Sequence, residues 1–356
     1  MTPAEGRALF PVLARRAYLN AGSVGPLSRN TLQAIEATDA LGLERGRGAV
    51  STFESAHASQ QKLRERIAGL IGVTAENVVL TTSTTEGCNI VVTGLRLEPE
   101  DEVVTTDGEH PGLEMPLLAS GATIKKARVL DRPAADALAA ILELVTPRTR
   151  LIALSHVLWL TGHVLPLADI KRETGLPLLV DGAQSVGAVP VDASVADWYT
   201  VSGQKWLCGP ETIGALYVAD HTKLRPRMQS YASTAHEDAG RLGVTHLGTS
   251  MIAGLLAAVD ERPEWAFERA AEMVALCRTV LLDAGVEVRT EAAQGTLISF
   301  RIPGDPPEIV KQAEAQDIVI RNLPDGWLRA SVGWWNDETD ISRLVEFLRR
   351  QPSIVE

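Results

Sequence analysis

Hydrophobic and polar positions follow two different periods along the first two thirds of the chain. Short apolar runs rich in β-branched residues, such as NVVLTT and EVVTT, alternate with longer segments whose apolar residues recur every three or four positions. The short runs predict strands at residues 77–82, 102–106, 123–129, 151–155, 176–181, 198–202 and 214–218. The longer segments predict helices at residues 51–69, 84–93, 113–120, 134–145 and 167–174.

This alternation predicts an α/β fold with a mostly parallel sheet and helices on both of its faces. The run GALYV at 214–218 follows WYTVS at 198–202 too closely for a helical crossover. We therefore expect 214–218 to be an antiparallel strand that is reached by a loop. Ligands of such sheets bind beyond the carboxyl ends of the strands, so the chemistry is expected directly after the apolar runs.

From about residue 260 onward the pattern changes. A long amphipathic helix is predicted at 265–284 and a final helix at 337–350, with short strands between them at 286–290, 297–302 and 318–321. A chain of 356 residues is longer than one compact core usually holds. We expect a large domain over 20–255, which binds the ligand, and a smaller α+β domain formed by 1–19 and 256–356.

Composition narrows the function classes. The formal net charge is −11 and the basic residues are scattered, which argues against a nucleic-acid partner. We find no apolar run of 18 residues and no N-terminal signal-peptide pattern, so we expect no association with a membrane. Three cysteines, far apart in sequence, are not typical of a disulfide framework or a zinc site and favour a cytoplasmic protein.

Two residues at the ends of apolar runs are candidates for a functional site. Asp181 ends the run LPLLVD and precedes a glycine turn; from this motif alone a turn cap and a ligand-facing carboxylate are equally acceptable. Lys205 lies in TVSGQKWLCGP, among apolar neighbours, whereas most lysines are solvated. Partial desolvation would lower its pKa, as a Schiff-base nucleophile requires, and an ionised aspartate would keep a pyridinium nitrogen protonated.

Three further segments add to this pair. TTSTTEGCNIVV carries hydroxyl groups and free N–H groups into a helix N-terminus, which suits a phosphate, although Ser and Thr caps are common. Ser202 and Gln204 flank the lysine and add possible donors. His110, after EVVTT, is placed to stack on a planar ring and to handle protons, or is simply structural. Arg329, in LRASVGWW, is either a carboxylate partner or a surface arginine.

The order of a phosphate turn, His, Asp-x-x-Gln, Ser-x-x-Lys and a late Arg is much more specific than its parts. It resembles the class V aminotransferase family of fold-type I pyridoxal 5′-phosphate (PLP) enzymes, which includes cysteine desulfurases, isopenicillin-N-epimerase-like proteins and cysteine/cystine lyases. The resemblance extends from YLNAGSVGPLS to RASVGWWNDETDISRL, and DGAQSVGAVPVD…VSGQKWLCGPETIGALYV is its most specific part.

The resemblance implies a role for each residue. Lys205 would hold PLP as a Schiff base, Asp181 would face the ring nitrogen, and His110 would stack on the ring. Gln184 would contact the ring hydroxyl, and Arg329 would bind the α-carboxylate of an amino-acid substrate. The implied phosphate ligands are Thr84, Thr85, Ser202, Gln204 and, across the subunit interface, Thr249. The family is dimeric, so the resemblance also implies a homodimer with its sites at the interface.

Two departures from the desulfurase pattern direct the functional expectation. SHVLWLTGHVLP places Trp159 where desulfurases usually have Ser-Asn, and RNLPDGWLRAS lacks their mobile-loop cysteine. The segments SHVLWLTGHVLP and KWLCGP are most similar to those of the cysteine/cystine lyases. We therefore expect a PLP-dependent carbon–sulfur β-lyase acting on cysteine, cystine or a related amino acid. A class V aminotransferase, a cysteine desulfurase and an epimerase remain alternatives, and a non-catalytic binding protein is a minor one.

The substrate side chain is not defined by these motifs. Residues near Trp159, His163, Tyr231 and His246 are candidates for its pocket, although core packing explains most of them equally well. Cys208 lies close to the lysine in sequence, and we interpret it as a packing residue.

Overall fold

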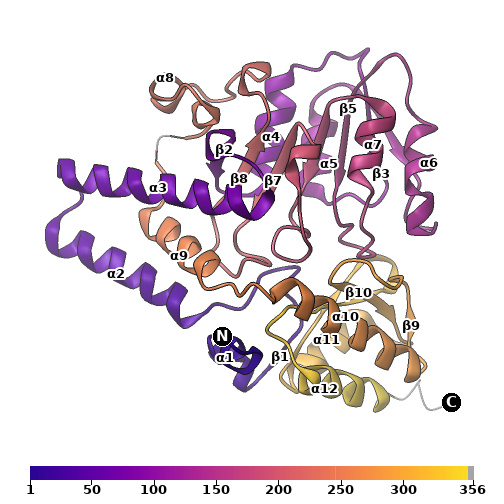
Figure 1. The fold of residues 1–356 in the computed structure, drawn as a ribbon. Coiled ribbons are helices and arrows are strands. Elements are labelled where there is room, and N and C mark those ends of the chain that lie inside the picture. The colour runs from indigo at the N-terminus through magenta and orange to yellow at the C-terminus, as the bar shows by residue number, and fades with distance from the viewer. Residues whose placement is uncertain (245, 352–356) are drawn as a thin grey trace.

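The computed structural model describes residues 1–244 and 246–351. The larger part of the molecule is built around a seven-stranded sheet with the strand order β2-β8-β7-β6-β5-β3-β4 (Figure 1). The strands are β2 (Val78–Thr81), β3 (Glu102–Thr106), β4 (Thr123–Ala127), β5 (Thr149–Ser155), β6 (Leu178–Asp181), β7 (Trp198–Ser202) and β8 (Gly214–Val218).

The sheet is mostly parallel, as the sequence predicts. Strands β4, β3, β5, β6 and β7 pair in parallel, and β8 is antiparallel to both β7 and β2. This confirms the expectation of an antiparallel GALYV strand. Because β2 and β7 both oppose β8, the carboxyl ends of β2, β3, β5, β6 and β7 point to the same edge of the sheet.

Helices cover both faces of this sheet because its strands alternate their side chains between two apolar cores. Val104, for example, packs with α3, α6, α7 and α9, whereas Val103 packs with α4 and α5. These helices are α3 (Val50–Ile71), α4 (Thr84–Leu95), α5 (Pro111–Ala119), α6 (Ala137–Leu142), α7 (Leu167–Thr174) and α9 (Thr249–Asp260). The helix predicted at 134–145 is shorter, since a 3₁₀ turn forms its first residues.

Helix α2 (Arg29–Arg45) was missed by the sequence reasoning. It extends beside α3 away from the sheet and packs against α9 (Figure 1). Its only buried residue is Thr31, so it has no apolar stripe of the kind that predicts a helix. The hydroxyl of Ser28 caps it by accepting a hydrogen bond from the backbone N–H of Thr31.

The C-terminal part forms a second, four-stranded sheet with the order β12-β13-β10-β9 and its own apolar core. N-terminal strand β1 pairs in parallel with β11 and forms a separate two-stranded sheet with it. The elements are β1 (Ala17–Tyr18), α10 (Ala266–Asp283), β9 (Glu287–Val288), β10 (Leu297–Arg301), α11 (Pro306–Glu314), β11 (Ile318–Val319), β12 (Arg321–Asn322), β13 (Leu328–Ser331) and α12 (Glu338–Arg349). Short helices α1 (Pro3–Ala8) and α8 (Ala232–Ala235) complete the α-helices of the described residues.

Two details of this region differ from expectation. The single strand predicted at 318–321 is two short strands, β11 and β12, that belong to different sheets. Strand β13 was not predicted, because Arg329 interrupts its apolar pattern. The boundary expected between residues 255 and 256 falls inside α9, so the division into two domains remains a proposal.

No helix within the described ranges is both long enough and apolar enough to cross a membrane.

Candidate active site

The carboxyl edge of the large sheet collects most of the residues that the sequence selects. Asp181 is the last residue of β6 and is the register partner of Ser155, the last residue of β5. Lys205 follows the end of β7, and His110 follows the end of β3. The charges of Lys205 and Asp181 both act on the imidazole of His110, and the charge of Asp181 acts on the amine of Lys205.

Asp181 is buried, and one of its two carboxylate oxygens accepts hydrogen bonds. Its Oδ1 accepts from the backbone N–H of Ala183 at 2.9 Å and from the hydroxyl of Thr200 at 3.1 Å. Its other oxygen, Oδ2, accepts no hydrogen bond from the residues that the structure describes. An aspartate held in this way has one oxygen left for a cationic N–H donor, such as a pyridinium nitrogen.

Lys205 is a buried amine with a lowered pKa. Burial lowers its pKa to about 8, Asp181 opposes the shift, and the cations of Arg329 and Arg321 add to it. Its Nζ forms no hydrogen bond or salt bridge with any residue that the structure describes. An amine that is neutral in a large fraction near pH 8 and lacks a partner suits nucleophilic attack on an aldehyde.

The loop before α2 closes over this lysine. The N–H of Gly25 donates to the carbonyl of Gln204 at 2.7 Å, and a Cβ at Gly25 would lie 2.1 Å from the carbonyl oxygen of Lys205. Only glycine allows this approach. Gln184 ties the same segments together, since its Nε2 donates to the carbonyl of Gly22 at 2.9 Å and its Oε1 accepts from the indole of Trp206 at 3.0 Å.

His110 caps helix α5. Its Nδ1 accepts a hydrogen bond from the N–H of Gly112 at 3.0 Å, so the neutral ring carries its proton on Nε2. Burial, followed by the charge of Lys205, lowers its pKa below the ordinary value. The edge of its ring meets the ring of Trp159, with 5.3 Å between centroids and an interplanar angle of 83°. The neutral imidazole is thus held in one orientation at the rim of the site.

Arg329 is a buried cation without an anion. It is 1% exposed, and it donates from Nη1 to the carbonyl of Trp159 at 3.2 Å and from Nη2 to the hydroxyl of Ser23 at 3.3 Å. Its Nε has no hydrogen-bond partner within the described ranges. No carboxylate in the described residues pairs with it, and burial lowers its pKa to about 9. Arg321, its register partner on β12, also donates to Ser23 Oγ, at 2.8 Å. Two guanidinium groups on one hydroxyl form a site for anionic ligands.

The predicted phosphate ligands are partly assembled. Thr84 and Thr85 are the first residues of α4, whose N-cap is Ser83. The hydroxyl of Thr85 lies near Gly112 in the first turn of α5, since a Cβ at this glycine would be 2.7 Å from it. The positive end of a helix and these hydroxyl groups suit a phosphate. At the lysine, Ser202 Oγ donates to Gln204 Oε1 at 2.9 Å.

Thr249 stands apart from these residues. It is exposed in the first turn of α9 and forms no hydrogen bond with the other predicted ligands described here.

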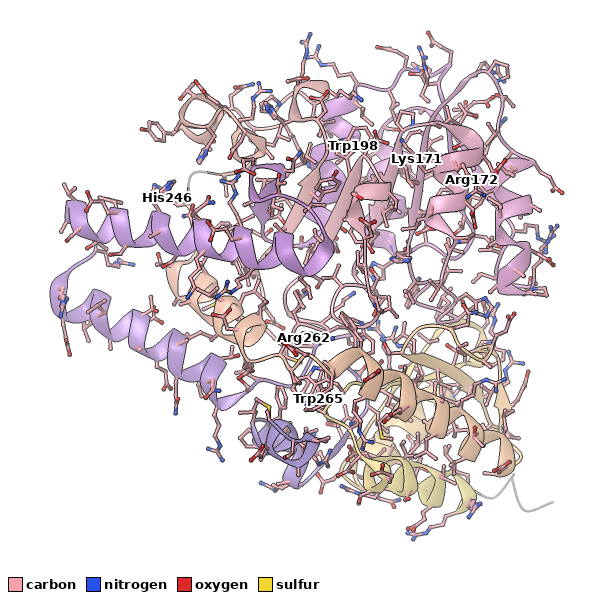
Figure 2. The ribbon with its side chains drawn as sticks, viewed as in Figure 1. Lys171, Arg172, Trp198, His246, Arg262 and Trp265 are labelled. Atoms are coloured by element: carbon pink, nitrogen blue, oxygen red, sulfur yellow. The ribbon has the colours of Figure 1, made fainter. Side chains whose placement is uncertain are left out.

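The candidates for the side-chain pocket separate into two groups. Trp159 contacts His110 and Arg329, as described above, and its buried Nε1 has no hydrogen-bond partner among the residues that the structure describes. His163 is buried, with Nε2 3.9 Å from a carboxylate oxygen of Glu291. Tyr231 and His246 are exposed in a single chain, and Figure 2 shows His246 beside α3, away from the C-terminal unit.

Cys208 is buried beside Gly25, and its Sγ lies 4.0 Å from the carbonyl oxygen of Trp206. Burial raises the pKa of its thiol well above the ordinary value, which fits the packing interpretation better than a thiolate nucleophile.

Three polar residues at the site were missed by the sequence reasoning. Ser23 and Arg321 join Arg329, and the buried carboxyl of Glu109 precedes His110. The sequence carried a signal for Glu109 alone, since it directly precedes a selected histidine. Arg321 and Ser23 reach the site only through the folding of distant segments onto each other.

These features fit the cofactor that the sequence suggests. An amine and a carboxylate oxygen without partners among the described residues, an imidazole held in one orientation and a helix N-terminus meet at one sheet edge, next to a buried guanidinium. This combination on a mostly parallel sheet defines a fold-type I PLP-dependent enzyme.

Comparison with known proteins identifies the family. Residues 26–254 match the family model described as Aminotransferase class-V, so the chain belongs to the class V aminotransferase family, and its cofactor is PLP. Isopenicillin N epimerase of Amycolatopsis lactamdurans is 29% identical, over 93% of this chain and 94% of the relative.

Solved structures agree. A variant of C-DES with glycine covalently linked to its PLP cofactor has a TM-score of 0.90 and 30% identity, covering 97% of this chain and 99% of that one. The cysteine desulfurase CsdA of Escherichia coli has a TM-score of 0.86 at 24% identity, covering 98% of each chain, and shares the fold.

Proposed function

We propose that this protein is a PLP-dependent carbon–sulfur β-lyase that acts on cystine, cysteine or a related amino acid. The observation that carries the proposal is the similarity, over 96% of this chain and 99% of its counterpart, to the cystine C–S lyase C-DES in complex with cysteine persulfide, with a TM-score of 0.90. The lack of a cysteine in the segment 321–331 supports elimination over a persulfide relay through that loop.

Each residue at the carboxyl edge of the sheet would bind a different part of the cofactor. Lys205 would form the covalent Schiff-base link, Oδ2 of Asp181 would accept from the ring nitrogen, and His110 would stack on the ring. Gln184 keeps a second N–H for the ring hydroxyl. The phosphate would be held by Thr84, Thr85, Ser202, Gln204 and, from a second subunit, Thr249. When bound, PLP supplies an electron sink that stabilises negative charge at the substrate Cα.

The chain's own residues would then control the reaction. Arg329 binds the α-carboxylate in a bidentate pair and so fixes which bond of Cα faces the cofactor ring. Lys205, whose pKa is lowered by burial, would remove the Cα proton of the bound substrate. The Cβ–S bond breaks, and the sulfur leaves with the bonding electron pair. Hydrolysis of the remaining three-carbon fragment yields pyruvate and ammonia.

Arg321 supports a substrate with two carboxylates. Its guanidinium shares Ser23 with Arg329, so a second cation lies beside the α-carboxylate clamp. Cystine carries a second carboxylate beyond its disulfide, whereas cysteine does not. Among the proposed substrates, this arrangement favours cystine.

We further propose a homodimer in the cytoplasm. Helices α2 and α3 extend from the body of the molecule (Figure 1), and their outer ends expose large apolar side chains. These are Leu41, Leu43, Val50 and Phe53. A second copy covering them would remove a surface that water disfavours and would bring Thr249 toward the neighbouring site. The three cysteines are buried and unpaired, which is consistent with a reducing compartment.

The test is to incubate the PLP-loaded enzyme with cystine and to measure pyruvate, sulfur products and the cofactor spectrum together. A β-lyase releases pyruvate and persulfide and retains the aldehyde form of the cofactor. Pyridoxamine phosphate with a keto acid would identify an aminotransferase, alanine with sulfur a desulfurase, and loss of stereochemistry without pyruvate an epimerase. Lys205→Ala should abolish turnover, and an unchanged biological activity in this variant would support a binding protein.

A further inference from the structure

Glu109 is a buried carboxyl that the proposed mechanism does not use. It is 7% exposed, between the end of β3 and His110. Its Oε1 accepts from the hydroxyl of Thr106 at 2.5 Å, and its Oε2 accepts from both the backbone N–H and the hydroxyl of Ser155, at 2.9 and 2.6 Å. None of the Lys, Arg or His side chains in the described ranges forms a salt bridge with it.

This carboxyl is bound to the strand end next to the aspartate that would face the cofactor. Ser155, which holds Glu109, is the register partner of Asp181 in the adjacent strand. The charge of Asp181 acts on Glu109, and both carboxyls act on the thiol of Cys88 in α4. The titratable groups that face Glu109 are therefore an acid on β6 and a thiol on α4, and neither compensates a negative charge.

Burial of this kind favours the protonated acid. Desolvation first, and then the negative charge of Asp181, raise the pKa of Glu109 to about 7, against the opposing hydrogen bonds from Ser155 and Thr106. In the protonated form, Oε2 still accepts both bonds from Ser155, and Oε1–H donates to Thr106 Oγ1. The same geometry therefore serves a neutral carboxylic acid.

We propose that Glu109 is a positioning residue: as a neutral acid it fastens the segment bearing His110 to the end of β5 and adds no negative charge beside Asp181, the anion that would face the cofactor ring. Ionisation of Glu109 then adds a second negative charge near the site. This inference concerns the arrangement around PLP and does not depend on which reaction the enzyme catalyses. Only the test that follows the absorption of the bound cofactor rests on the proposed placement of PLP against Asp181.

The first test needs no cofactor. Glu109→Gln mimics the neutral acid, because its amide oxygen accepts from Ser155 and its NH₂ donates to Thr106. In the apoenzyme, folded Glu109 holds its proton more tightly than unfolded Glu109, so the wild-type fold loses stability as the pH rises from about 4.5 to about 7. The difference in Tm between E109Q and wild type should therefore increase over this range and stay level above it.

Glu102→Gln is the matched control. Glu102 is buried at the other end of β3, but Lys125 and Arg148 pair with it and its pKa is lowered to about 2. E102Q should destabilise the fold by a similar amount at every pH between 5 and 8. A difference between E109Q and wild type that stays constant across this range would overturn the proposal, because Glu109 would then not titrate there.

The second test uses the PLP-loaded protein. Above pH 7 the ionised Glu109 of the wild type stabilises a protonated Schiff base, so the pH midpoint of the cofactor's absorption change should be about half a unit to one unit lower in E109Q. E102Q should leave this midpoint unchanged. An E109Q midpoint equal to that of wild type would refute the electrostatic role.

Ser155→Ala keeps the test decisive if E109Q fails to fold. This variant removes one hydrogen bond that stabilises ionised Glu109 and retains the bond from the backbone N–H. The pH at which apoenzyme stability becomes level should therefore rise in S155A. A transition at unchanged or lower pH would contradict the proposal.

Discussion

Replacement of Arg329 by Met should make the protein more stable and much less active. The guanidinium is almost completely buried and has no anionic partner among the described residues. A pKa held at about 9 instead of 12.5 corresponds to a destabilisation of the free protein on the order of 5 kcal/mol at neutral pH. Methionine has a similar length and fills the space without a charge.

The net gain is smaller, because the substitution also removes two hydrogen bonds. Arg329 donates to the carbonyl of Trp159 and to Ser23 Oγ, which together offset about 2–3 kcal/mol. The free energy of unfolding of R329M should therefore exceed that of wild type by about 2 kcal/mol, with a Tm higher by a few degrees.

The same substitution removes the partner of the substrate carboxylate. Truncating one member of a buried, hydrogen-bonded ion pair costs about 2–5 kcal/mol, which corresponds to a loss of about 30- to 5,000-fold in kcat/KM. Thermal denaturation of the apoenzyme and steady-state kinetics of the PLP-loaded enzyme measure the two effects separately.

Arg301→Met, on the neighbouring strand β10, is the control, since this arginine is partly exposed, stacks on Trp327 and lies outside the proposed site. It should change kcat/KM by less than threefold. A lower Tm for R329M together with wild-type kcat/KM would refute the assignment of Arg329 as an anion site.

Three further predictions concern the site. Lys205→Met should stabilise the apoenzyme by about 1–3 kcal/mol below pH 8, because the buried amine is charged there; the gain should shrink toward pH 10.5 in denaturation titrations, and a gain independent of pH would contradict it. Trp159→Phe keeps the contact with His110 but loses an unpartnered N–H, so KM for cystine should rise about three- to tenfold with little change in kcat; an unchanged KM would exclude this donor. Cys208→Ala should retain kcat within about twofold, and a complete loss would show that the thiol is more than packing.

The order of strands and helices was predictable where the apolar pattern was strong. The five parallel strands and the antiparallel strand at 214–218 appear where the alternation predicts them, because buried strands need continuous apolar runs. Asp181, Lys205 and His110 converge because Asp181 ends such a strand and the other two follow one, all at the same edge of the sheet. Their positions in the sequence carried this information.

The remaining parts of the site depend on contacts between distant segments. The apolar pattern does not predict strand β13, because Arg329 lies within it and this charged side chain is held by hydrogen bonds to distant segments, at Ser23 and Trp159. Arg321 reaches the same hydroxyl through a two-residue strand, too short to leave a periodic pattern. Glu109 gives no periodic signal either, since Ser155, which donates hydrogen bonds to its carboxyl, lies 46 positions later.

The covalent link to PLP is the centre of this account, and reduction with borohydride tests it most directly. The PLP-loaded enzyme would be reduced, digested and sequenced by mass spectrometry. We predict a single phosphopyridoxyl group on Lys205, and none after reduction of Lys205→Ala. Attachment to another lysine, or an unmodified Lys205 in an enzyme that retains PLP, would contradict the account.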